Sequence, residues 1–427
     1  MRTLLALVVV ALWTGCGSPG RRGGDDTGGA DACVGLECRV TNCAIRNMPE
    51  TTISGTVFAP NGTLALYGVN VYIPNSDPGP LVDGVACSQC QNALPGGSVA
   101  QMISGADGKF MLTKVPDGVN VPLVIQVGKW RRRVDIANVL PCQDNILPPN
   151  VTSLPKNKSE GDLPKIAMTT GGCDQLECLV RKLGVDSKEF TSESGTGRIN
   201  LFNSGGHSGD STGVVLTTGE SLWGDLAKLK KYDIAAFSCE CSPHSGATPA
   251  MMSNVKTFAD LGGRVFMSHY NAQWISGSAS APQPVWSTVA ACSIEGSPPN
   301  STGVIDQVNN PKGAAFATWM MNVGGATGGS FNITDSRNSC TSVNNMKAER
   351  WVYLTGTELP QNFQFTTPQE SPKDNRCGKV VFSDMHVSGG GTSGNFPSSC
   401  TMGTLTPQEK ALAFMFFDIA SCVGPIF

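Results

Sequence analysis

The 427-residue chain contains only four histidines, and each follows a short apolar stretch that predicts a β-strand. His207 follows "RINLFNSGG", His244 follows "AAFSCECSP", His269 follows "RVFMS" and His386 follows "VVFSDM". If these strands are parallel, their carboxyl ends meet at one edge of a sheet, where open α/β folds bind ligands. The polar residues expected to face one crevice at that edge are His207, Glu240, His244, Ser268, His269, Asp384 and His386.

One chemistry that suits these residues is metal binding. His207, His244 and His269 could hold zinc or a similar divalent ion, because imidazole is a common zinc ligand. Asp384 or Glu240 could then orient a bound water. The set has no spacing signature, so no cofactor is certain from the sequence.

The other chemistry is nucleophilic catalysis. Ser268, His386 and Asp384 could act as nucleophile, base and orienting acid. This set also lacks a spacing signature, and the sequence leaves both chemistries open.

Cys239 ends a predicted buried strand in the stretch "YDIAAFSCECSPH". Cys241 lies two residues further on, and an exported chain matures in an oxidising compartment where cysteines pair. We therefore expect Cys239 to be in a disulfide rather than to act as a nucleophile.

Strands and helices alternate through residues 164–427. The predicted strands "KIAMTT", "RINLFN", "YDIAAFS", "RVFMSHY" and "GKVVFSDMHV" are separated by helices such as "QLECLVRKLG", which Asp174 can cap. A closing helix begins at Thr406 with a proline and a capping-box Glu409. This order predicts an open, mainly parallel sheet with helices on both faces, carrying a loop-rich insertion at about 275–375.

Residues 44–150 instead show short strands separated by turn signals, such as "NG" and "DG". They predict an antiparallel β-sandwich. The Pro-rich stretch 151–163 predicts a linker between the two domains. The expected fold class is therefore multidomain, β followed by α/β.

Two family resemblances accompany these patterns. "SGTVFAPNGTLALYGVNVYIP" and "GADGKFMLTKVPDG" resemble the carboxypeptidase regulatory-like, transthyretin-like modules. That resemblance implies a non-catalytic β-sandwich.

"YDIAAFS", "ADLGGRVFMSHY" and "CGKVVFSDMH" resemble the class I glutamine amidotransferase-like superfamily, particularly its ThuA-like members. Glutamine-hydrolysing members place a cysteine between small residues at a sharp strand-to-helix elbow. This chain has Ser268 or His269 there without flanking glycines, so the resemblance implies a degenerate domain without glutaminase activity.

The amino-terminal residues predict export. Residues 1–15 have the charge and apolar core of a signal peptide, and Thr14, Gly15 and Cys16 resemble a lipobox. The alternative is an ordinary thiol at Cys16 beside a conventional cleavage site. We expect Cys16 to be lipid-modified and 16–43 to form a Gly-rich tether with a cysteine cluster. Because Gly17 rather than Asp follows, the outer membrane is the expected destination.

The cysteine count predicts disulfides. Of 16 cysteines, 15 remain without Cys16, so at least one is unpaired or bonded outside the chain. Cys87 and Cys90 have the spacing of a redox or zinc pair but lack that context, which favours structural bridges.

Composition excludes nucleic acid as a partner, since the net charge is −3 and basic residues cluster only briefly. The expected function is that of a cell-envelope lipoprotein, held at the membrane by its lipid, that binds a glycan, a peptide or an envelope protein without catalysis. The alternative is a metal-dependent or Ser/His-dependent hydrolase that uses the strand-end crevice.

Overall fold

Alternating buried and exposed side chains build two small sheets in the first part of the chain. In β4 (Lys109–Thr113), for example, Phe110 and Leu112 point inward while their neighbours are exposed. The first sheet has the order β4-β1-β7, with β1 (Thr52–Thr56) antiparallel to β4 and parallel to β7 (Asp144–Ile146). The structure is a computed structural model that describes residues 33–277, 285–293, 298, 301–387 and 393–424.

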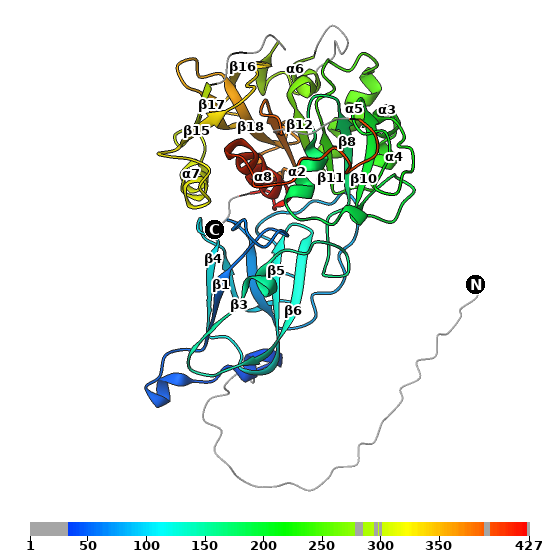
Figure 1. Cartoon of the computed structure of the whole chain (residues 1–427). Helices are drawn as coiled ribbons and strands as arrows, with labels where there is room; N and C mark the ends of the chain where they lie inside the picture. The colour runs from blue at the N-terminus through cyan, green and yellow to red at the C-terminus, as the bar shows by residue number, and fades with distance from the viewer. Residues whose placement is uncertain (1–32, 278–284, 294–297, 299–300, 388–392, 425–427) are drawn as a thin grey trace, which may run out of the picture. The chain divides into compact units, whose positions relative to one another are not determined.

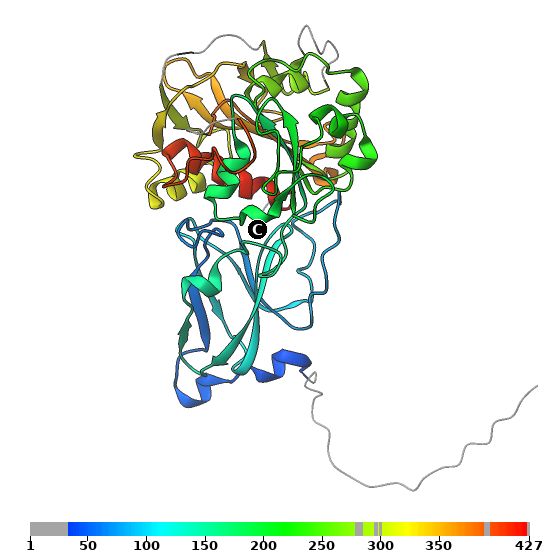
Figure 2. The same ribbon diagram turned by 45° about the vertical axis from the view of Figure 1, so that its right-hand side comes forward.

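The second sheet is antiparallel, in the order β3-β2-β5-β6. Its strands are β2 (Asn70–Pro74), β3 (Ser98–Ile103), β5 (Gly118–Val127) and β6 (Trp130–Val139). Buried residues of both sheets, including Ile53, Val71 and Leu123, belong to one hydrophobic core. We call residues 52–146 the two-sheet region, which is blue to cyan in Figures 1 and 2.

The rest of the chain forms a ten-stranded mixed sheet in the order β15-β14-β17-β18-β19-β12-β11-β8-β10-β9. The strands from β19 to β9 are parallel, which confirms the expected α/β class. They are β8 (Ile166–Gly171), β9 (Phe190–Thr191), β10 (Ile199–Ser204), β11 (Ile234–Phe237), β12 (Arg264–Ser268) and β19 (Gly378–Ser383).

The remaining four strands come from the predicted insertion and extend the same sheet antiparallel. They are β14 (Ser301–Ile305), β15 (Ser330–Ile333), β17 (Glu349–Leu354) and β18 (Pro360–Thr367). A separate hairpin pairs β13 (Ala290–Cys292) with β16 (Cys340–Val343). The sequence therefore located this segment but missed that it completes the central sheet.

Helices cover both faces of the sheet, as the alternation of its side chains requires. In β11, Ile234 and Ala236 join the core under α8 (Pro407–Ala420), whereas Ala235 and Phe237 join the core under α5 (Pro249–Asp260). The first core also receives α2 (Leu176–Lys182) and α7 (Gly313–Asn322), and the second receives α3 (Gly219–Trp223) and α6 (Gln273–Ser276). Figure 1 shows α8, in red, against the sheet strands.

The predicted linker packs into the structure. Leu154 is fully buried, and Thr152 at the end of the short helix α1 (Pro149–Thr152) donates to the carbonyl of Thr56. The chain from Gly35 onward forms one compact unit, while the unit before it, up to Val34, lies almost wholly outside the described residues. The predicted signal peptide and Cys16 fall there, so both stay predictions.

Disulfides join distant parts of the chain. Cys87 bonds Cys377 and Cys90 bonds Cys422, which confirms that this pair makes structural bridges. Further bridges are Cys43–Cys142, Cys173–Cys241, Cys178–Cys400 and Cys292–Cys340, and Cys33 and Cys38 are also disulfide-bonded. No helix within the described ranges is long and apolar enough to cross a bilayer.

Candidate functional site

The carboxyl ends of the parallel strands carry the predicted polar residues, as the sequence order implied. His207 follows β10, Cys239 follows β11, His269 follows β12 and His386 follows β19. Within the described residues, however, the contacts of these side chains do not join them into one group. They separate into three clusters, each with its own partners.

The first cluster, which we call the Cys–His–His cluster, consists of Cys239, His269 and His386. Potential ligand atoms of the three side chains all lie within 4.8 Å of one another. The Sγ atom of Cys239 is 3.3 Å from Nδ1 of His269, and the imidazole rings of His269 and His386 are 5.0 Å apart. All three side chains are buried, and Nε2 of His386 has no hydrogen-bond partner.

Cys239 is the one free cysteine within the described part of the chain. The expected disulfide at Cys239 is therefore wrong, because Cys241 turns away and bonds Cys173 instead. Cys241 has a φ of 71°, and this left-handed turn separates the two thiols that the sequence places side by side.

His269 occupies the strand-to-helix elbow. It has a φ of 43°, a conformation that a non-glycine residue rarely adopts, where β12 passes into the 3-10 turn η4 (His269–Ala272). Asn271 secures this turn, because its amide donates to the carbonyls of Phe237, Ser238 and Ser268. The elbow therefore presents an imidazole at the carboxyl end of β12.

Burial keeps the Cys–His–His cluster uncharged at neutral pH. It raises the pKa of the Cys239 thiol to about 12. It lowers the pKa of His269 to about 2, with further contributions from His386 and Arg337. The pKa of His386 is also lowered by burial, although nearby Asp174 opposes the shift. Neutral imidazoles are the form that binds metals.

Asp174 does not cap the helix α2 as the sequence suggested. It is fully buried, accepts from Oγ of Ser268 at 2.5 Å and from the Val387 amide at 2.8 Å, and its pKa is raised by burial. The helix begins after Gln175 instead. Asp174 thus ties the end of β12 to the segment after β19.

The predicted Ser268–His386–Asp384 set is not formed. Ser268 hydrogen-bonds Asp174, and Asp384 accepts from the amide and the hydroxyl of Ser339 at 2.9 and 2.6 Å. Burial raises the pKa of Asp384 to about 7. The hydroxyl of Ser268 and the carboxylate of Asp384 therefore hydrogen-bond other residues and not His386.

The second cluster contains His207. Its Nδ1 lies 2.6 Å from Oε1 of Glu177, and its Nε2 lies 2.6 Å from Oγ of Ser399. Sequence reasoning missed Glu177 and Ser399, because one lies in a helix 30 residues away and the other in a loop 192 residues away. No spacing pattern could have connected them.

The third cluster contains His244. Its Nδ1 is 2.9 Å from Glu240 and its Nε2 is 3.3 Å from Glu220, and the hydrogen bond that Nδ1 donates to Glu240 raises the pKa of His244. The second contact is a charge contact rather than a hydrogen bond. The predicted metal set of His207, His244 and His269 is therefore wrong, since each belongs to a different cluster.

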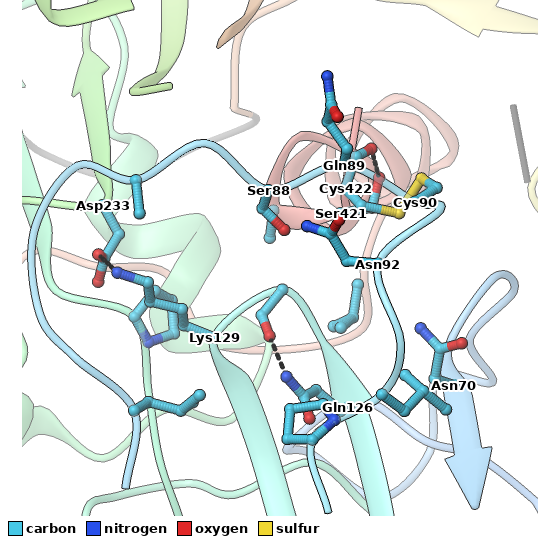
Figure 3. Close-up of a pocket in the computed structure, with 18 of the residues that line it drawn as sticks. Asn70, Ser88, Gln89, Cys90, Asn92, Gln126, Lys129, Asp233, Ser421 and Cys422 are labelled. Atoms are coloured by element: carbon cyan, nitrogen blue, oxygen red, sulfur yellow. Dashed lines mark hydrogen bonds and ion pairs between the residues drawn. A yellow bond between two sulfur atoms is a disulfide. The ribbon is translucent and has the colours of Figure 1, made fainter. Parts of the chain in front are cut away.

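A cavity of about 1070 Å³ lies away from these clusters. Its walls include Asp233 and Arg264 at the amino ends of β11 and β12, and thus the opposite edge of the sheet. The two-sheet region supplies most of the other walls, including the loop of residues 81–95, and Ala420, Ser421 and Cys422 at the end of α8 complete them. Figure 3 shows Ser88, Asn92, Gln126 and Lys129 around this space, with Lys129 paired to Asp233. Carboxamides dominate the polar lining: Asn70, Gln89, Gln91, Asn92, Gln101 and Gln126.

Comparison with known proteins does not assign a family. No family model and no curated protein matches the chain. A ThuA-like protein from Bacteroides uniformis is 12% identical, with a TM-score of 0.34 over 59% of this chain and 88% of that one. A GH42 β-galactosidase, Gan42B, is 6% identical, with a TM-score of 0.30 over 63% of this chain and 31% of that one. Such low scores support no inference about activity.

Proposed function

We propose that this protein is an exported metal-binding protein whose α/β part holds one zinc-type divalent ion through Cys239, His269 and His386. The observation that carries the proposal is a buried, unpaired thiol beside two buried imidazoles, in a chain where the other described cysteines are in disulfides. Few thiols stay unpaired in an oxidising compartment, so a free thiol at Cys239 favours a role for its sulfur other than disulfide bonding.

The donor set suits zinc. Sulfur and imidazole nitrogen are its usual protein ligands, and a site with three protein ligands leaves one position for water or a substrate. Because ligand atoms already lie within 4.8 Å of one another, small side-chain rotations would bring them around a single ion. The buried, unpartnered Nε2 of His386 supplies a lone pair that has no other use among the described contacts.

The surroundings also suit an ion. Nδ1 of His386 is 3.7 Å from a carboxylate oxygen of Asp335, a residue whose side chain is 60% exposed and which also pairs with Arg337. A carboxylate behind a ligating imidazole orients it and raises its basicity. Asp335 thus connects the buried cluster to the surface and offsets the charge of Arg337.

Metal analysis tests this proposal. We expect protein purified without added metal to contain about one equivalent of zinc per chain, as measured by elemental mass spectrometry. Cys239→Ala and His386→Ala should lose most of it, while His244→Ala, in the third cluster, should keep it. Equal metal content in all four proteins, or none in any, would overturn the proposal.

A second candidate function is ligand binding in the carboxamide-lined cavity. Its volume suits a small molecule, and side-chain amides both donate and accept, as sugar hydroxyls and peptide groups do. This supports the binding of a neutral glycan or peptide, and the sequence of residues 1–16 is what favours placing the protein at the outer membrane as a lipoprotein anchored through Cys16. Titration calorimetry with neutral oligosaccharides and peptides would test it, and absence of binding across both sets would reject it.

A further inference from the structure

The second cluster has the connectivity of a charge-relay triad. A carboxylate, an imidazole and a hydroxyl follow one another through two hydrogen bonds of 2.6 Å, from Glu177 through His207 to Ser399. With the proton on Nδ1 of His207 donated to Glu177, Nε2 is left to accept from the hydroxyl of Ser399 at 2.6 Å, a shorter contact than the 3.4 Å from that hydroxyl to the carbonyl of Ser393. That is the tautomer that a general base requires.

Burial follows the same order. Glu177 and His207 have no exposed side-chain surface, whereas Ser399 is partly exposed. The acid and the imidazole are therefore both buried, and the hydroxyl is the outermost member, where a substrate could reach it. The second carboxylate oxygen of Glu177 has no hydrogen-bond partner, so His207 is the main partner of this acid.

Contacts to both the backbone and the ring hold His207 in place. The carbonyl oxygen of His207 accepts from the hydroxyl of Thr170 and the amide of Asn203, at 2.8 and 3.1 Å. Its ring lies edge-to-face against Phe396, with centroids 5.7 Å apart. Positioned bases of this kind lose little entropy during reaction.

A disulfide connects the segments that carry the acid and the hydroxyl. Cys178 follows Glu177 directly and Cys400 follows Ser399 directly, and these two cysteines are bonded. The bridge therefore joins the backbone beside the acid to the backbone beside the hydroxyl. A serine in a loop can otherwise move relative to a helix, and this disulfide restricts the movement of Ser399 relative to α2.

We propose that Ser399, His207 and Glu177 form a catalytic triad for acyl transfer from carboxylic esters. Oγ of Ser399 attacks the ester carbonyl while Nε2 of His207 takes its proton. The carbonyl carbon to alkoxy oxygen bond breaks, and the alcohol leaves with the proton from His207. Water then attacks the acyl-serine with help from the same base, which releases the acid and restores Ser399.

The triad is independent of the Cys–His–His cluster. It uses other side chains, and neither the attack nor the hydrolysis requires a metal. Chelator treatment is therefore expected to remove the proposed zinc without abolishing acyl transfer, which keeps the two proposals separable. Loss of all serine reactivity on chelation would contradict this metal-independent mechanism.

A fluorophosphonate probe tests the triad, because it phosphonylates only an activated serine. We expect one label per chain, located on Ser399 by peptide mass spectrometry. Ser399→Ala should abolish the labelling, and Ser398→Ala, which alters an adjacent exposed hydroxyl, should preserve it. A label elsewhere, or none, would overturn the proposal.

The positions of His207 and Glu177 are tested by the rate of labelling. His207→Gln should slow it on the order of 10³-fold or more, and Glu177→Gln by a smaller factor, with p-nitrophenyl ester hydrolysis following the same order. Circular dichroism and thermal unfolding identify variants that fail to fold. A folded His207→Gln protein that labels at the original rate would show that the contacts are only structural.

Discussion

Asp418 illustrates how strongly a single buried charge depends on its partners. It lies in α8 and contacts two lysines, the half-buried Lys312 at 2.7 Å and the buried Lys379 at 3.1 Å. Burial would raise the pKa of Asp418, but the two ammonium groups more than offset this and hold it well below its usual range. Burial also lowers the pKa of Lys379 to about 8. The carboxylate therefore favours the charged form of both lysines.

We expect Asp418→Asn to lower the free energy of unfolding by about 3–5 kcal/mol at pH 7, because it leaves the buried Lys379 and the half-buried Lys312 without their counter-ion. The pKa of Asp418 is lower folded than unfolded, so its stabilisation is present above about pH 4 and is lost as pH falls further. The deficit of the variant should therefore shrink in acid. Urea unfolding from pH 7 to pH 3 measures this, and a deficit independent of pH would contradict it.

Cys239 provides a second test at the scale of the residue. Its thiol has no exposed surface and a raised pKa, both of which suppress alkylation. We expect no labelling of residues 33–427 by iodoacetamide in the folded state. After unfolding without reductant, one label should appear, at Cys239, and none in Cys239→Ala. More than one label would show that the disulfides differ from those described.

At the scale of the element, the elbow after β12 depends on contacts from other strands. The sequence "MSHYN" has no glycine, the residue that most readily adopts a left-handed backbone conformation, yet His269 adopts this conformation. Asn271 stabilises the turn through three donated hydrogen bonds and accepts a fourth from Trp274 at 3.0 Å. Those contacts hold the imidazole of His269 toward Cys239.

Asn271→Ala should therefore cost about 2–4 kcal/mol of unfolding free energy, because buried carbonyls lose their donors. It should also reduce zinc content, since His269 would no longer be held in place. Asn322→Ala, which removes one exposed hydrogen bond to Ala106, serves as the control and should change neither quantity. A stable Asn271→Ala protein with unchanged zinc would refute this role.

At the scale of the whole molecule, the two-sheet region is fastened to the α/β part by its longest loop. Between β2 and β3, Cys87 and Cys90 form disulfides to residues 290 and 332 positions away. Lys129 pairs with Asp233, and Gly128 lies so close to Ala420 that a Cβ atom would be 1.9 Å from its carbonyl oxygen. These contacts surround the carboxamide-lined cavity, so its walls are held together covalently.

Removing one bridge tests this arrangement. The double variant Cys90→Ala with Cys422→Ala should lose about 2–5 kcal/mol of unfolding free energy, because cross-links between distant residues restrict the unfolded chain. Any ligand of the cavity should bind it more weakly, whereas fluorophosphonate labelling of Ser399 should persist. Unchanged denaturant unfolding would show that this bridge does not fasten the two parts.

The local features of this protein could be predicted from its sequence. Apolar stretches of strand length, the Thr406 capping box and the turn signals before residue 150 depend on neighbouring residues, and all three appear in the structure. Parallel strands place their carboxyl ends together, so the sequence also identified the edge that carries the histidines.

Which side chains meet at that edge depended on the tertiary structure. The sequence of a strand predicts where the strand ends but not the conformation of the turn that follows. Because Cys241 adopts a left-handed conformation, it bonds Cys173, and Cys239 contacts His269 instead. Ser399 hydrogen-bonds His207, which lies 192 residues away in the sequence, and the neighbouring Cys178–Cys400 disulfide holds this loop near α2. The spacing of the cysteines in the sequence does not predict that disulfide. A hydrogen-bond partner stabilises a buried polar group, and several partners of the same type were available. Packing made that choice, because it alone sets the distances between segments that are remote in the chain.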